Sequence, residues 1–397
     1  MARPACWTKN VYVNGGSQIS NNYTWTADII NVSHIFAASM CYTKIMPTSF
    51  VRSAALCAAA SLLVPLANAQ QTHTLLATPA TVAWGYYWSQ ARPVLTVRSG
   101  DTVVMQTLST CGPPARLETR GITPVDIPPY VADIYDKVPQ SERGPGGHIL
   151  TGPVSIEEAE PGDVLEVRIK KVHIDVPWAC NGAGKNGFLA RDFPDGYSKI
   201  IPLDLKKMTA AFSPGITIPL HPFFGSMGIA PPEEAGKLNS APPGTHAGNM
   251  DNKELVEGTT VFIPVHTKGA LFEAGDGHAG QGNGEVDITA METMLTGTFQ
   301  LIVHKKAESV SPLLWPRAET PAYYISMGFD EDLTRATEIS IRNMITFLSE
   351  QMTDHPRISR EEAYSLISVA CDVDITELVD GNKGVHTMCA KSLFTTK

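Results

Sequence analysis

Prolines and glycines recur along almost the whole chain, and they limit how long any helix can run. The sequence holds 29 prolines and 32 glycines in 397 residues. Proline lacks a backbone N–H donor and clashes with the preceding helical turn, while glycine loses much conformational freedom in a helix or strand. With 43% hydrophobic and 18% charged residues, the chain can still bury a sizeable core. We therefore expect a β-rich globular fold of many short strands and turns.

Alternating apolar and polar residues predict where some of these strands lie. Residues 93–98 and 102–105 flank a glycine-containing turn, and residues 148–154 and 164–169 flank a turn at 160–163. Successive side chains of a strand point to opposite faces, so a period of two indicates a strand.

Two helices are predicted near the C-terminus. Acidic residues 330–332 lie where a helix N-terminus carries partial positive charge, and an apolar stripe then runs to about Met352. Ser359 and Glu362 have the spacing of a capping box, which predicts a second helix from residue 360.

Residues 112–147 contain many prolines and glycines without clean periodicity, so we expect a long excursion over the β core. It serves either as a lid or as a contact with a neighbouring subunit. Together with residues 230–243, it is a candidate contact surface for a homo-oligomer.

Residues 46–69 have the pattern of a secretory signal peptide. Arg52 precedes an apolar run at residues 54–66, and Ala67, Asn68 and Ala69 give the small-residue pattern before Gln70. We expect cleavage after Ala69 and a periplasmic or secreted protein. The run is shorter than the roughly 20 residues that a spanning helix needs, so stable membrane insertion is not expected. Residues 1–45 are either an upstream stretch before a true start at Met40 or Met46, or a genuine extension.

Removal of the leader leaves four cysteines, which can pair in three ways; they are Cys111, Cys180, Cys371 and Cys389. Export permits disulfides, but the sequence does not choose among the pairings. The formal net charge is −9 and no long basic run occurs, which excludes nucleic acid as an expected partner.

Imidazole and carboxylate groups gather between Leu220 and Thr293, among many glycines. These groups are ligands for Zn²⁺ and related divalent ions, and glycine permits tight turns and close approach of a small molecule. The predicted metal ligands are His246, Asp251, Asp276 and His278. Zn²⁺ is the expected ion, with Ca²⁺ or Mg²⁺ as alternatives. Taken alone, either histidine is more typical of a hydrogen-bonded structural residue.

Three further residues of this segment are candidate catalytic groups. Glu292 shares one face of an alternating stretch, residues 286–292, with apolar side chains, which would desolvate its carboxylate unless a partner neutralises it. We predict that Glu292 is the acid/base group, with Glu285 as second candidate and His221 beside them. The alternatives are a buried ion pair of Glu292 with Lys268 or Lys305, and a turn role for His221.

Three stretches resemble the acetamidase/formamidase family. They are His148–Pro153 with Glu160–Leu165, His221–Gly225 with Gly228–Pro231, and Gly248–Asn252 through Gly275–Ala279 to Glu285. The resemblance covers roughly residues 90 to 395. It implies hydrolysis of small linear amides to a carboxylate and ammonia. It also implies a mainly β fold, with β-sandwich or jelly-roll-like portions, barrel-like portions and an α/β C-terminal portion. The catalytic region is then residues 70–397, β-rich over 70–320 and α/β over 321–397.

For an amide substrate, the side chains of Asn249, Asn252 and Gln281 are predicted to orient the carboxamide, because an amide both donates and accepts hydrogen bonds. A metal ion would polarise the amide carbonyl and activate water. The alternative is an exported, non-catalytic β-rich binding protein in which the same residues hold a structural metal ion.

Overall fold

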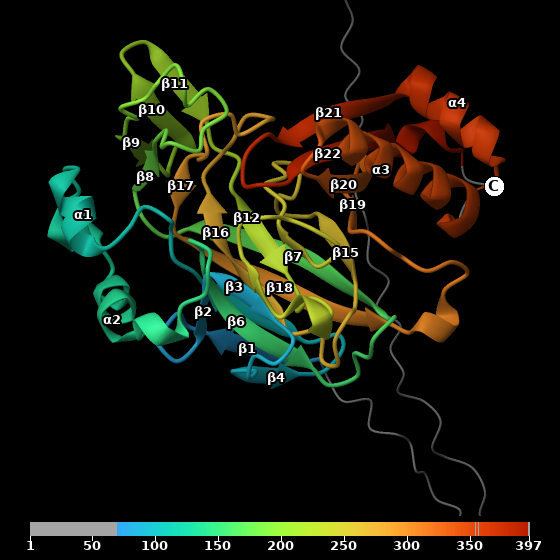
Figure 1. Ribbon diagram of the computed structural model, residues 1–397, viewed down its shortest axis with the longest axis horizontal. Helices are drawn as coiled ribbons and strands as arrows, with labels where there is room; N and C mark the ends of the chain where they lie inside the picture. Colours follow the sequence, from blue (N-terminus) through green and yellow to red (C-terminus); the bar gives the residue numbers. More distant parts are fainter. Residues whose placement is uncertain (1–69, 354, 356, 396–397) are drawn as a thin grey trace, which may run out of the picture. The chain divides into compact units, whose positions relative to one another are not determined.

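One large β-sheet runs from the first described strand to the C-terminal region (Figure 1). The computed structural model describes residues 70–353, 355 and 357–395, so the predicted extension (1–45) and signal peptide (46–69) lie outside the described residues. Within them, nine strands form this sheet. In order across the sheet they are β1 (Thr72–Leu75), β5 (Thr102–Gln106), β18 (Leu295–His304), β7 (Val164–Ile174), β15 (Thr260–Pro264), β19 (Arg317–Glu319), β20 (Tyr323–Asp330), β22 (Lys383–Ala390) and β21 (Cys371–Glu377).

A second sheet has eleven strands in the described part of the chain. Its main path is β11 (Ile216–Pro219), β10 (Thr209–Ser213), β9 (Lys199–Asp204), β8 (Trp178–Asn181), β17 (Glu292–Thr293), β16 (Phe272–His278), β12 (Phe223–Gly228) and β14 (Ala247–Asn249). A branch adds β6 (Ile149–Ile156), which pairs with β16, β2 (Val82–Trp84) and β4 (Leu95–Val97). A separate pair joins β3 (Tyr86–Trp88) to β13 (Lys237–Asn239).

The two large sheets pack against each other through one hydrophobic core. Phe299 of β18 lies fully buried, with its ring centroid 5.2 Å from that of Phe224 on β12 and 5.5 Å from that of Phe272 on β16. Both ring pairs have the edge-on arrangement that aromatic quadrupoles favour. The mainly β, sandwich-like fold is therefore as predicted.

The expected barrel-like portion does not appear as a closed barrel. Over the described residues, the strand order of the first sheet ends at β1 and β21, and the main path of the second ends at β11 and β14. Closure requires the two end strands to pair, and here each sheet stays open and is covered on one face by the other.

The two predicted C-terminal helices are present. Helix α3 (Leu333–Thr346) begins after Asp332, whose side chain accepts a hydrogen bond from the Arg335 backbone N–H, and a π-helical turn (Phe347–Gln351) continues it. Helix α4 (Arg360–Ala370) has the predicted capping box between Ser359 and Glu362. The Ser340 hydroxyl of α3 lies 2.8 Å from that of Thr387 on β22, which places α3 against the C-terminal strands.

The excursion at residues 112–147 is more regular than predicted, because it contains helices α1 (Pro114–Thr119) and α2 (Pro129–Lys137). Each helix starts with proline at its first position. A backbone N–H at this position has no acceptor within the helix, so the lack of an N–H in proline costs no hydrogen bond. Val131 and Ile134 bury the inner face of α2 beside Trp178. Proline thus begins these helices and does not mark a loop, which corrects the prediction for this segment.

Short 3₁₀ turns connect several of these elements. They are η1 (Pro124–Asp126), η2 (Gln140–Glu142), η3 (Glu233–Ala235), η4 (Lys306–Glu308) and η6 (Lys391–Leu393). None of the described helices has the length and apolar character to cross a membrane.

Replacing Phe299 with alanine tests the packing between the sheets. Phe299→Ala leaves a cavity among aromatic rings from both sheets, so the free energy of unfolding should fall by about 3–5 kcal/mol. Urea denaturation measures this, with Phe188→Ala as control because Phe188 is 56% exposed. Equal losses in the two variants would contradict the assignment of Phe299 to the core.

Candidate functional site

Strand β16 brings Asp276 and His278 to one point, as their spacing of two residues predicted. The Nε2 atom of His278 lies 3.3 Å from Oδ2 of Asp276. Neighbouring β17 pairs His278 with Glu292, whose Oε1 also lies 3.3 Å from Nε2. All three residues are buried. The sheet register therefore places an imidazole between two carboxylates, away from bulk water.

A glycine on β12 makes room for this group. A Cβ atom on Gly225 would lie 2.4 Å from Oδ1 of Asp251, 2.5 Å from Oδ2 of Asp276 and 2.8 Å from Cε1 of His278. Such distances are too short for a methyl group, so only glycine fits here. The Gly225 carbonyl also accepts a hydrogen bond from the Asp251 backbone N–H, which fixes Asp251 over the strand.

Gln281 sets the orientation of the His278 ring. Its Nε2 donates to the backbone carbonyl of Asp251 at 2.7 Å, so its Oε1 is the atom that faces Nδ1 of His278 at 2.9 Å. Because Oε1 can only accept, Nδ1 is the donor, and Nε2 is directed at the carboxylates. A polar partner of this kind on the second ring nitrogen is usual for metal-binding histidines. Gln281, predicted to bind substrate, also lines the pocket described below.

The other two predicted substrate-binding amides are buried in the protein. Asn249 accepts from the Ser226 hydroxyl at 2.6 Å and donates to Oδ2 of Asp251 at 2.6 Å. Asn252 is fully buried, and its Oδ1 accepts from the Glu254 backbone N–H. The contacts of Asn249 make it a support for Asp251.

Two predicted histidines lie apart from the cluster. His246 is buried with its ring edge against Tyr87, at 5.0 Å between centroids, and joins none of the candidate metal groups found among the described residues. Burial lowers the pKa of His246 to about 3, which is the behaviour of a neutral core histidine. His221 is exposed and lines the pocket.

Glu285 joins the cluster together with His148, Glu377 and Asp380, which were not among the predicted site residues. The Gly284 N–H donates to the Thr376 carbonyl, and the Leu378 N–H donates to the Gly284 carbonyl, so the end of β21 pairs with this loop. The pairing brings Glu377 and Asp380 to Glu285 and Asp251, where the carboxylate oxygens lie within 4.8 Å of one another. His148 adds a second imidazole, 3.9 Å from Asp276. His148 stands in one of the motifs quoted above, whereas Glu377 and Asp380 carry no comparable local signal.

The stretch 286–292 is not the predicted alternating strand. Only Glu292 and Thr293 are in a strand, and Ile288 has a positive φ of 83°. The side-chain amide of Asn181 donates to Asp287 and to the backbone carbonyls of Thr289 and Ala290, which holds the segment as a loop. These side-chain bonds replace the ladder bonds that a strand would need.

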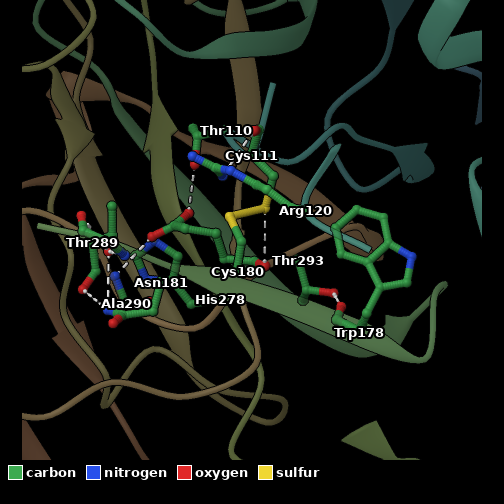
Figure 2. The surroundings of a disulfide bond; sticks show 12 residues. Thr110, Cys111, Arg120, Trp178, Cys180, Asn181, His278, Thr289, Ala290 and Thr293 are labelled. Atoms are coloured by element: carbon green, nitrogen blue, oxygen red, sulfur yellow. Dashed lines mark hydrogen bonds and ion pairs between the residues drawn. A yellow bond between two sulfur atoms is a disulfide. The ribbon is translucent and has the colours of Figure 1, made fainter. Parts of the chain in front are cut away.

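A disulfide lies beside Thr110 in the segment that leads into Cys111 (Figure 2). Cys111 is bonded to Cys180, and Cys180 is the strand partner of Glu292. The hydroxyl of Thr110 donates to Oε2 of Glu292 at 2.8 Å, and the Ala290 N–H donates to Oε1 at 2.8 Å. Glu292 is thus held by two donors, one of them next to the disulfide. The second disulfide, Cys371 with Cys389, joins β21 to β22.

The buried charges shift one another's pKa values. Burial, with the charge of Asp276, raises the pKa of Asp251 to about 8. Burial raises the pKa of Asp380 to about 6 and the pKa values of Glu285 and Glu377 well above their usual range. Burial opposes the charge of His278, but Glu292 and Asp276 raise its pKa. Without a cation, the cluster therefore retains protons at neutral pH.

The arrangement fits a divalent metal ion. One ligand atom each of Asp251, Asp276 and His278 lies within 4.8 Å of the others. Oδ1 of Asp251 has no hydrogen-bond partner among the described residues, although it is buried. A buried, unpartnered acceptor beside an oriented imidazole is what a cation would satisfy.

Through Glu285, the cluster borders a pocket of about 750 Å³. Glu285, Gln281 and His221 line its polar side, while Phe212 and Met291 contribute apolar walls. A small molecule in this pocket could contact Glu285, which lies next to His278 and Glu292 in the cluster.

The raised pKa values predict a pH effect on stability between pH 7 and pH 9. Unfolded carboxylates are ionised throughout this range, whereas folded Asp251 holds a proton until about pH 8. The unfolded state thus binds fewer protons, so the free energy of unfolding of metal-free protein should fall with rising pH, by about 1 kcal/mol for Asp251 alone. Urea denaturation at pH 7 and 9 measures this. Asp251→Asn should weaken the dependence, and a stability that rises with pH would contradict it.

Comparisons with known proteins agree with the motifs quoted above. The acetamidase/formamidase family model matches residues 145–239 and 234–394, more than half of the chain. A formamidase of Methylophilus methylotrophus is 28% identical over 46% of this chain and 59% of its own length, and an acetamidase of Mycolicibacterium smegmatis is 28% identical over 36% and 49%. The chain spans about half the length of these curated relatives.

Solved structures match over more of their length. An acetamidase from Yersinia enterocolitica has a TM-score of 0.69 and 27% identity, covering 84% of this chain and 96% of its own. An acetamidase from Bacillus halodurans has a TM-score of 0.65 and 28% identity, covering 81% and 98%. Because the family model matches more than half of the chain, and these solved acetamidases share its fold, the chain belongs to the acetamidase/formamidase family.

Proposed function

We propose that this protein is an amidohydrolase that cleaves the C–N bond of small linear amides, such as formamide or acetamide, to a carboxylate and ammonia. The observation that carries the proposal is the buried cluster of His278 and carboxylates at the wall of a pocket. Family membership and the activities named for the relatives support the substrate class. A purely structural metal site would be closed, whereas this one borders a pocket through Glu285.

The proposal includes a divalent metal ion, with Zn²⁺ as the first candidate. Asp251, Asp276 and His278 would hold it, because their ligand atoms converge and a histidine with an oriented second nitrogen suits zinc. When bound, such an ion polarises an amide carbonyl oxygen and makes water a stronger nucleophile near neutral pH. His246 is left out of the set because it lies against Tyr87.

Glu292 and Glu285 divide the proton transfers between them in this proposal. Glu292 is held by Thr110 and the Ala290 N–H, and a carboxylate fixed by two donors suits a base that takes a proton from water. Glu285 lines the pocket, and burial raises its pKa, so it can carry a proton to the departing nitrogen. Each carboxylate has an atom within 4.8 Å of His278.

We also propose that the chain works outside the cytoplasm. The two disulfides of the described region support this, because such bonds persist in oxidising compartments. The signal-like pattern at residues 46–69 points the same way. Assembly into a homo-oligomer stays a prediction.

An ammonia-release assay with formamide and acetamide tests the function and the role of Glu292. Glu292→Gln should lower kcat by at least about 100-fold, because a positioned acid/base group contributes that much. Its metal content should stay near that of the unchanged protein, since the three proposed ligands remain. Chelation should abolish release by the unchanged protein, and added Zn²⁺ should restore it.

Glu118→Gln is the matched control, because the Glu118 carboxylate is exposed on α1. Unchanged turnover in Glu292→Gln would remove Glu292 from the mechanism. Absence of ammonia release from any short amide, with metal tightly retained, would favour a binding protein instead.

The two disulfides should differ in their effect on activity. Cys111→Ser with Cys180→Ser frees the segment that carries Thr110 and the strand partner of Glu292, so kcat should fall at least about tenfold. Cys371→Ser with Cys389→Ser removes the link between β21 and β22, which contacts neither Glu292 nor Thr110, and should change mainly the melting temperature. Similar kcat losses in both double variants would show that Cys111–Cys180 has no special positioning role.

A further inference from the structure

We infer that Asp251, Glu377 and Asp380 hold a second divalent cation, next to the ion proposed for Asp251, Asp276 and His278. The carboxylate oxygens of Asp251, Glu285, Glu377 and Asp380 lie within 4.8 Å of one another. Asp251 belongs to both groups, so it would be shared between the two ions. The inference goes beyond the proposed amide hydrolysis and does not depend on that activity.

Glu377 supplies the observation that points to a ligand. Its side chain is completely buried, and no N–H or O–H donor of the described residues bonds to either of its carboxylate oxygens in the ionised form. Its near neighbours include the carboxylates of Asp251, Glu285 and Asp380. An ionised carboxylate buried in this way is strongly unfavourable unless a cation or a proton compensates it.

The charge of the whole cluster favours more than one cation. Six carboxyl groups gather here, belonging to Asp251, Asp276, Glu285, Glu292, Glu377 and Asp380. Their ion pairs within the described chain are with the imidazoles of His148 and His278, and none is with lysine or arginine. When all six are ionised and both imidazoles are protonated, four negative charges remain, and two divalent cations would neutralise them.

The donor set indicates the kind of cation. The three proposed ligands offer only carboxylate oxygens, which suit hard ions such as Ca²⁺ and Mg²⁺, whereas His278 suits Zn²⁺. Asn249 donates to Oδ2 of Asp251 and to Oδ2 of Asp380, at 2.6 and 3.3 Å, so it aligns these two carboxylates and leaves Oδ1 of Asp251 free. We therefore assign Ca²⁺ or a similar hard ion to this second position.

The site would also join distant parts of the chain. Glu377 ends β21, whereas Asp251 follows β14 in the other sheet. A cation between them would link the C-terminal strands to the strands that carry His278. Its loss should therefore lower the melting temperature as well as the metal content.

The test is metal stoichiometry on the whole purified protein. After removal of metals with a chelator, the protein is loaded with Zn²⁺ and then titrated with Ca²⁺ in a calorimeter, and bound metals are counted by mass spectrometry. The unchanged protein should take up one Ca²⁺ per chain in addition to Zn²⁺, with a rise in melting temperature. Glu377→Gln and Asp380→Asn should bind Ca²⁺ at least about tenfold more weakly and lose the rise.

Two controls separate this inference from the proposed function. Glu118→Gln, with its exposed carboxylate, should bind Ca²⁺ like the unchanged protein. His278→Ala should lose Zn²⁺ but still take up Ca²⁺, with the rise in melting temperature. The double variant His278→Ala with Glu377→Gln should lose the Ca²⁺ uptake as well. Metal counts and melting temperatures give these answers whether or not any amide is hydrolysed.

The inference is overturned if the unchanged protein binds no ion beyond Zn²⁺. It is also overturned if Glu377→Gln and Asp380→Asn keep the full Ca²⁺ response, since another site would then hold the ion. A metal-free wild type that is as stable at pH 7 as the Ca²⁺-loaded form would show that shared protons, and not a cation, compensate Glu377.

Discussion

Burial of carboxylates around one imidazole is the constraint on which the central part of this structure depends. Asp276 and Glu292 both contact Nε2 of His278 in a region closed to bulk solvent. Buried charges of one sign repel and lose their hydration, so they persist only when donors, protons or cations offset both effects. Strand pairing holds the groups in place, because β16 and β17 fix His278 opposite Glu292.

The sandwich supplies the space for this cluster by leaving side chains out. Gly225 on β12 keeps its position free for a carboxylate oxygen each of Asp251 and Asp276 and for the ring carbon Cε1 of His278. The edge-on rings of Phe224, Phe272 and Phe299 fill the space between the sheets. The polar cluster is thus built next to a closely packed apolar core.

Local patterns in the sequence predicted local structure well. The alternation at residues 148–154 and 164–169 falls in β6 and β7, and the capping box at Ser359 begins α4. The same reasoning failed where side chains from elsewhere decide the backbone. Asn181 holds residues 287–290 as a loop despite their alternating pattern, and prolines at 114 and 129 begin helices that pack near Trp178.

Part of the site was also readable from the sequence, because strand geometry forces residues two apart to the same side. That rule alone joins Asp276 to His278, and the glycine-rich neighbourhood of Asp251 suggested the third member. Only the tertiary structure decided that His246 stays against Tyr87 and that Glu377 and Asp380 reach Asp251. The position of Glu377 and Asp380 depends on the pairing of β21 with the loop at Gly284, across more than ninety residues of chain. A sequence records which groups are present, but the sheet register and long-range pairing determine which of them share a buried volume.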